Sequence, residues 1–182
     1  VTTKRGQSGN PVMDVSAGSG ISRLLKKLDV LTGDEYRKAL SDYGLTGGDF
    51  GKSEDAFDAI TQTGITQNYS KSMSGGSENG RYRVSAGYLD QQGIIKETDF
   101  KKLTAGITGT YKFLNSKKLT VDFNVNTAHI REELAPISSY AGFTGNLVSQ
   151  ALQWNPTHLL KYSADSIWVD PAVGSTTVNP LK

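Results

Sequence analysis

The sequence lacks cysteine and contains no long apolar run. None of the 182 residues is cysteine, which excludes disulfide bonds and cysteine-ligated metal sites. The longest unbroken apolar run is three residues, as in Ile167–Val169, which excludes a transmembrane helix. Low hydropathy does not exclude the membrane, because a strand of a membrane barrel carries its apolar side chains only at every second position.

The chain also lacks an excess of charge of one sign. Lys plus Arg total 20 and Asp plus Glu total 18, which leaves a net charge of +2. A nucleic-acid-binding protein is expected to show a basic excess clustered on one face. We therefore predict no nucleic-acid partner.

Residue patterns that carry enzymatic or metal chemistry are missing too. Gly47–Ser53 resembles a phosphate-binding loop. That motif requires its first glycine at position 46, where this sequence has Thr46. No G-x-S-x-G nucleophile turn occurs. His129 lies near Glu132 and Glu133, but no second histidine stands at ligand spacing. The sequence predicts no enzyme, no cofactor and no metal site.

Apolar and polar residues alternate with a period of two from Tyr69 to Val125, which predicts successive β-strands. One face of these strands is apolar or aromatic, and the other consists of Thr, Ser, Asn, Gly and charged residues. The apolar face comprises Tyr69, Met73, Tyr82, Val84, Ala86, Tyr88, Leu103, Ala105, Ile107, Tyr111, Phe113, Leu119, Val121, Phe123 and Val125, with Lys71 as an exception. Alternation alone fits both a soluble sandwich and a membrane barrel.

Strand length and loop length favour the barrel. Lys102–Phe113 extends for about a dozen residues, longer than the usual globular strand and close to the length of a membrane-spanning strand. Short connections alternate with long ones at Gly20–Thr61, at Asp90–Asp99 and after Ala128, as expected for periplasmic turns and extracellular loops. Aromatic residues lie near the strand ends, where interfacial girdles belong.

The long segments are predicted to carry two short helices. Thr32 and Glu35 form a capping-box pattern, and Gly44 is placed to end the helix that follows. Thr144–Gln153 is the second candidate, and Val12–Gly18 is expected to be the first strand. The segment after Trp154 is interpreted as a loop.

Three aromatic residues near the end of the chain are candidate contacts for a substrate or partner. Trp154, Tyr162 and Trp168 could stack on sugar rings or on another apolar ligand. Packing of the long loop against itself is the favoured interpretation, because aromatic side chains mostly serve packing.

Several short segments, in order along the chain, resemble segments of the SusC/RagA-type TonB-dependent transporters. Together they cover nearly the whole sequence and are far more specific than any one alone. They are Val1–Gly9, Lys27–Leu31 with Asp34–Tyr36, Asn68–Gly76 with Arg81 and Tyr82, Gly87–Ile95, and Ala151–Thr157.

The resemblance implies an all-β fold, namely an antiparallel transmembrane β-barrel segment with long extracellular loops carrying short helices. About five strands of a larger, roughly 22-stranded plugged barrel are expected. Residues 1–10 would end the plug domain, 11–127 would hold the first strands with their loops, and 128–182 would form a long extracellular loop. The missing initiator Met fits processing or a segment of a longer protein.

The resemblance further implies active import of a nutrient across the bacterial outer membrane. Oligosaccharide is the expected substrate and peptide is the second choice. A SusD-like surface lipoprotein, TonB acting through an N-terminal part that this sequence lacks, and outer-membrane lipid are the expected partners. A soluble or surface-attached β-sandwich ligand-binding module is the alternative, and a passive porin is a further one.

Overall fold

The structure is a computed structural model, and it describes residues 6–113, 119–135 and 146–160. The chain divides into two compact units. The strand unit comprises Val1–Ser22, Gly64–Gly93 and Asp99–Glu133, and the loop lobe comprises Arg23–Thr63, Ile94–Thr98 and Leu134–Lys182.

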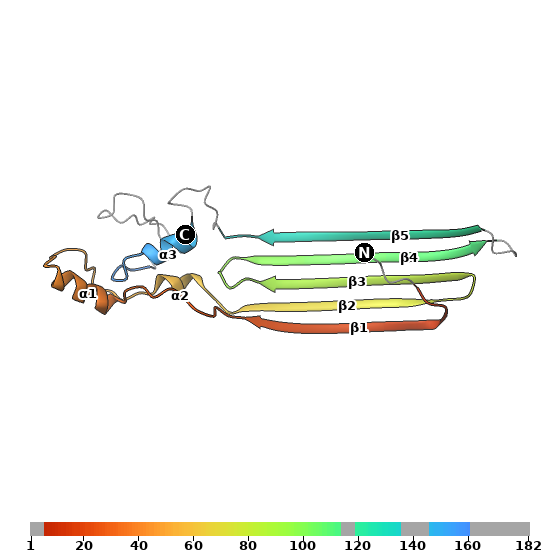
Figure 1. Cartoon of the computed structure of the whole chain (residues 1–182), viewed down its shortest axis with the longest axis horizontal. Coiled ribbons are helices and arrows are strands. Elements are labelled where there is room, and N and C mark those ends of the chain that lie inside the picture. The colour runs from red at the N-terminus through yellow and green to blue at the C-terminus, as the bar shows by residue number, and fades with distance from the viewer. Residues whose placement is uncertain (1–5, 114–118, 136–145, 161–182) are drawn as a thin grey trace. The chain divides into compact units, whose positions relative to one another are not determined.

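The strand unit is one antiparallel sheet whose strands follow each other in chain order, β1-β2-β3-β4-β5 (Figure 1). The strands are β1 (Gly9–Ser22), β2 (Gly64–Gly76), β3 (Gly80–Gln92), β4 (Asp99–Phe113) and β5 (Leu119–Glu133). They are 13 to 15 residues long, well beyond the usual five or six of a globular strand. The predicted antiparallel barrel-type strands are therefore confirmed.

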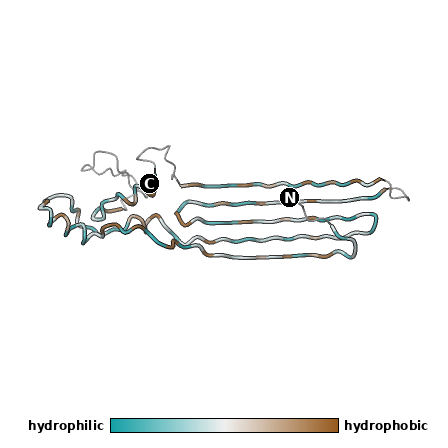
Figure 2. Tube along the Cα trace, in the orientation of Figure 1, coloured by the Kyte–Doolittle hydropathy of each residue, from teal (hydrophilic) through white to brown (hydrophobic). Residues whose placement is uncertain are grey.

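The register keeps most apolar positions on one face; Val12, Leu89, Phe100 and Ile130, near the strand ends, lie on the other. Val84 pairs with Met73 on β2 and with Ile107 on β4, and Ile107 pairs with Val125 on β5. Because strand side chains alternate with a period of two, each such row repeats at every second residue. Figure 2 shows the resulting alternation of hydrophobic and hydrophilic residues along the strands.

The first and last strands extend beyond their predicted limits. β1 runs over Gly9–Ser22 instead of Val12–Gly18, and β5 runs to Glu133 instead of ending near residue 127. The apolar signal fades there, because the same face carries His129 and Arg131, yet backbone pairing to β4 continues as far as Glu133. Residues 128–133 thus belong to a strand and not to the long loop.

Three helices belong to the loop lobe, within the residues that the structure describes. They are α1 (Gly33–Asp42), α2 (Ala56–Ile60) and α3 (Leu147–Gln153). The capping box predicted at the start of α1 is present, because Thr32 and Glu35 exchange hydrogen bonds. Gly44 follows α1 with a φ of 64°, a left-handed conformation that suits glycine after a helix.

The second and third helices pack into a small apolar cluster. Its buried members are Ala56, Ile60, Ala151, Trp154 and Leu160. α3 begins after the cap residue Asn146, later than the predicted Thr144, and α2 was not predicted because five residues give too little periodicity. No described helix is both long and apolar enough to cross a membrane.

Candidate functional site

One face of the sheet presents large apolar side chains that nothing in the described chain covers. In its central row, Val84 is 40% exposed, Ile107 46% and Val125 61%. The same row continues through Met73 and Met13. Neighbouring rows add Val15, Tyr69, Tyr88, Leu103, Tyr111, Phe113, Leu119, Val121 and Phe123. A contiguous apolar surface of this extent requires an apolar environment.

The height of this apolar face matches a membrane. On β4 it extends from Leu103 to Phe113. Ten steps of about 3.4 Å at a tilt of about 40° give roughly 25 Å, the height of the apolar band of outer-membrane barrels. Ile107 and Val125, which pair with each other, therefore lie close to its middle.

On β3, β4 and β5, charged side chains replace apolar ones beyond the Leu103 row, at the end of the sheet from which the long connections leave. Lys101 pairs with Asp99 at 3.3 Å, and Arg131 pairs with Glu133. The Tyr88 hydroxyl donates a hydrogen bond of 3.2 Å to Asp90. Tyr88 thus lies where the apolar band changes to a polar rim, as an interfacial aromatic residue does.

Lys71 is the charged exception on the apolar face, as the sequence indicated. Its Cα pairs with Val15 and Ala86, one row inside the row of Tyr69 and Tyr88. A lysine on the lipid side costs about 2–4 kcal/mol at the midplane of the bilayer but only about 0–1 near the interface. Its position close to the polar rim makes the charge tolerable.

The opposite face carries short polar side chains that bond to one another. Arg83 donates to the Ser72 hydroxyl at 2.8 Å, Ser16 and Ser70 share a bond of 2.7 Å, and Asn126 donates to Asn124 at 2.7 Å. These pairs hold the face in place and leave hydroxyl and amide groups directed away from the sheet. Such a surface offers hydrogen bonds to a hydrated solute.

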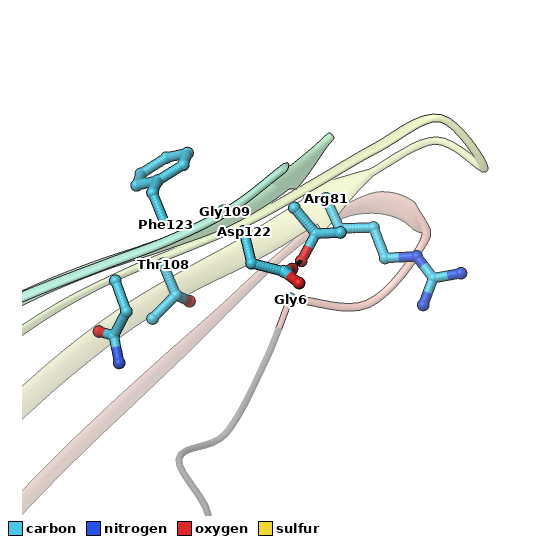
Figure 3. A pocket seen from close by; sticks show the side chains of 8 residues that line it. Gly6, Arg81, Thr108, Gly109, Asp122 and Phe123 are labelled. Carbon is cyan, nitrogen blue, oxygen red and sulfur yellow. Dashed lines mark hydrogen bonds between the residues drawn. The ribbon is translucent and has the colours of Figure 1, made fainter. Parts of the chain in front are cut away.

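The segment before β1 crosses this polar face. A Cβ on Gly6 would lie only 2.4 Å from the carbonyl oxygen of Tyr82, so Gly6 touches the β3 backbone directly. A cavity of about 120 Å³ lies beside it, lined by Arg81, Thr108 and Asp122 among others. Figure 3 shows Thr108 and Asp122 on the side of Gly6, with Phe123 on the other side of the sheet.

The Gly6 contact has a testable consequence. Gly6→Ala is expected to push the segment off the polar face, because the atoms opposing the new Cβ are backbone atoms of a paired strand. Faster proteolytic cleavage before β1 in the full-length protein would show this. Ser8→Ala, two residues further on and outside the contact, is the matched control; equal cleavage of both variants would contradict the contact.

In the loop lobe, the Asn155-Pro156-Thr157 segment bonds to residues 48–54, which precede it in the chain by about a hundred residues. Lys52 and Glu54 donate their amides to the carbonyls of Thr157 and Pro156, at 3.0 and 2.8 Å. The Thr157 side chain is fully buried, and its hydroxyl accepts from the Phe50 amide at 3.1 Å. Asn155 donates to the Gly48 carbonyl at 2.9 Å. The loop that resembled a nucleotide-binding motif is thus held by this segment.

A pocket of about 750 Å³ opens next to this segment. Tyr36, Trp154 and Pro156 contribute to its walls, and Asp29, Glu35, Glu54 and Asp55 bring four carboxyl groups to its lining. Among the residues that the structure describes, no Lys or Arg belongs to this lining, although Lys27 pairs with Asp55 from outside it. The size is typical of a small-ligand pocket, and the charge is acidic.

Two of these carboxyl groups are held ionised by their neighbours. Hydrogen bonds from the backbone amide and hydroxyl of Thr32 lower the pKa of Glu35. Burial raises the pKa of Asp55, but the ion pair with Lys27 at 2.5 Å and the Asp58 amide outweigh burial, so that its pKa falls. Both groups therefore stay charged at neutral pH.

The structure describes only one of the three candidate aromatic contacts. Trp154 is 5% exposed, belongs to the apolar cluster and has its ring 5.8 Å from that of His158. Tyr162 and Trp168 lie outside the described residues, so a ligand role for the three stays a prediction. The sequence analysis did not identify the contacts of Gly6 and Thr157. The Asn155-Pro156 pair beside Thr157 is the one local signal, because Asn-Pro favours a turn.

The comparisons with known proteins agree on one class. No protein-family model matches the chain. The TonB-dependent receptor SusC of Bacteroides thetaiotaomicron is 31% identical over 167 residues, which cover 86% of this chain and 15% of that protein. The TonB-dependent receptor P3 of Formosa agariphila is 28% identical over 185 residues, 99% of this chain and 18% of that protein.

Solved structures of the RagAB peptide importer share the fold. Its closed-closed state superimposes with a TM-score of 0.73 at 20% identity, over 98% of this chain and 24% of that one. A second RagAB structure gives a TM-score of 0.70 at 23% identity. The chain thus spans less than a quarter of the length of these relatives.

Long antiparallel strands with one apolar and one polar face define a segment of a transmembrane β-barrel. The chain belongs to the SusC/RagA-type family of TonB-dependent receptors. The relatives are receptors and not enzymes, in agreement with the absence of a catalytic motif from the sequence. A β-sandwich needs two sheets, whereas the described strands form a single sheet that matches this barrel fold. The structure therefore does not support the sandwich alternative.

Proposed function

We propose that this chain belongs to a receptor that actively imports a nutrient, most simply an oligosaccharide, across the bacterial outer membrane. The observation that carries the proposal is the two-faced sheet, apolar on one side over a membrane height and polar on the other. The similarity to TonB-dependent receptors supports the same conclusion.

The polar face supports passage of a hydrated solute. Its exposed groups are mainly hydroxyls and amides, such as those of Ser70, Asn124 and Asn126. Groups of this kind exchange hydrogen bonds with water or with sugar hydroxyls at little net cost. A transported molecule can therefore move along this face without being trapped.

The proposal includes an orientation and a division of the chain. Residues 1–10 would be the end of a plug that fills the lumen, and the contact of Gly6 with the polar face supports this. The short connections after β2 and β4 would face the periplasm, and the segments 23–63 and 93–98 and the chain after β5 would face the exterior.

The proposed partners are a SusD-like surface lipoprotein, which would bind at the external side, and TonB, which would supply energy through the remainder of the receptor. Outer-membrane lipid would surround the apolar face. The solved relatives are importers that contain two named components, RagA and RagB, and this supports a lipoprotein partner.

A peptide is the second candidate substrate. The solved relatives are described as peptide importers. The described residues that line the pocket of the loop lobe include carboxyl groups and no lysine or arginine, which suits an amine-bearing ligand better than an acidic one.

The test uses the full-length receptor in its native host. We expect it in the outer-membrane fraction, where affinity purification in mild detergent recovers a surface lipoprotein. Deletion of the gene is expected to abolish growth on one class of nutrient, and a panel of oligosaccharides and peptides as sole source identifies the class. Recovery of the protein alone from the soluble fraction would overturn the proposal.

A further inference from the structure

On the apolar face, Lys71 is a cation for which the described residues supply no counter-ion. Its side chain is exposed, and it makes no ion pair or side-chain hydrogen bond with the residues that the structure describes. Lys101 and Arg131 on the same face differ, because each has a carboxylate two residues away on its own strand. The charge of Lys71 is therefore available to a group outside the described chain.

The sheet itself places no carboxylate beside Lys71. Its own row continues through Val15, Ala86, Ala105 and Thr127, and the adjoining inner row is entirely apolar. The adjoining outer row is Ala17, Tyr69, Tyr88, Leu103 and His129. The nearest acidic group toward the rim on the neighbouring strand is Asp90, which already accepts the Tyr88 hydroxyl.

The depth of Lys71 places its ammonium group at the level of lipid headgroups. The residue lies two positions inside Tyr69, which corresponds to about 7 Å along the strand and about 5 Å along the membrane normal. A lysine stem extended toward the rim lies along apolar neighbours while its charged end reaches the interface. Tyr69 and Tyr88 flank that path, and Ala86 leaves space beside it.

We propose that Lys71, between Tyr69 and Tyr88, binds the phosphate of an anionic lipid headgroup in the outer leaflet of the outer membrane. The ammonium group supplies the charge, and the two rings border the site at the interface. The leaflet follows from the end of the sheet at which the long connections leave. The inference rests on the proposed outer-membrane location and adds a lipid site to it.

The experiment compares lipid retention by variants of the full-length receptor. The receptor is reconstituted in nanodiscs of phosphatidylcholine with a minor share of phosphatidic acid, whose phosphate is the probe. Native mass spectrometry then counts the lipid molecules that stay bound when the receptor is released from the nanodisc. Lys71→Gln is expected to lower retention of phosphatidic acid about fivefold, the effect of one cation near an anionic membrane surface. Lys71→Arg is expected to retain it.

Lys102→Gln is the matched control, because it removes the same charge from the polar face of β4. It is expected to leave retention unchanged. Equal retention by Lys71→Gln and the wild type would overturn the lipid site, and so would displacement of the lipid by inorganic phosphate. Outer-membrane fractionation and nutrient-dependent growth are measured on the same variants, so a failure of the lipid site is distinguished from a failure of the importer assignment.

Discussion

Val125→Lys is expected to destabilise the barrel by about 2–4 kcal/mol, the cost of a lysine on the lipid face at the bilayer midplane. Val125 is 61% exposed, and it pairs with Ile107 in the row that lies near the middle of the apolar band. Unlike Lys71, a lysine at this depth is far from either interface. The measurement is denaturant unfolding of the full-length receptor folded into lipid vesicles, followed by its gel mobility.

The control for this prediction is the adjacent residue. Asn124→Lys adds the same charge and side chain to the same strand, but on the polar face. We expect it to change stability by much less, because that face meets water. Equal losses of stability for the two variants would contradict the assignment of lipid and lumen faces. The sandwich alternative also predicts a loss of stability for Val125→Lys, but it differs in predicting that the chain folds in water without lipid.

Thr157→Val is expected to loosen the loop lobe by about 1–3 kcal/mol, the cost of removing a hydrogen-bonding hydroxyl from a buried site. The fully buried Thr157 hydroxyl accepts from the Phe50 amide and lies 3.2 Å from the Gly48 carbonyl. Hydrogen exchange of the Lys52 and Glu54 amides reports the change, because both bond to the segment containing Thr157. Acceleration by about tenfold for each 1.4 kcal/mol lost is expected.

Thr157→Ser distinguishes the hydroxyl from the rest of the side chain. Serine keeps the hydrogen-bonding group and loses only a methyl, so exchange is expected to stay close to that of the wild type. If Thr157→Val and Thr157→Ser accelerate exchange equally, packing of the methyl and not the hydroxyl network holds the lobe.

The strands were predictable because one physical rule acts along their whole length. Lipid on one side and water on the other select side chains at every second position, so the alternation from Leu103 to Val125 indicated both the strands and their faces. The rule weakens where the strand leaves the apolar band. The ends of β1 and β5 were therefore misplaced, since pairing at Arg131 depends on the neighbouring strand and not on hydropathy.

The loop lobe and the contact near β1 were less predictable, because long-range contacts decide them. The helix after Thr32 has a local capping signal and was found. The bonds from Thr157 to Phe50 and the approach of Gly6 to Tyr82 join residues far apart in sequence, and no local pattern specifies such partners. Trp154 was singled out for its residue type, while its burial depends on α2 and α3 packing together.

The loop lobe draws on connections that leave the sheet after β1, after β3 and after β5. The backbone amides of Gln62, Lys96 and Glu54 donate to the carbonyls of Ile94, Ile60 and Pro156, respectively. The connection after β1 is therefore hydrogen-bonded to each of the other two. Recombination that exchanged one of these loops between related receptors would remove one partner of each hydrogen bond and leave the other partner unpaired. The three segments are therefore expected to be inherited together, and a designer who wishes to transplant the loop lobe has to move all three of them.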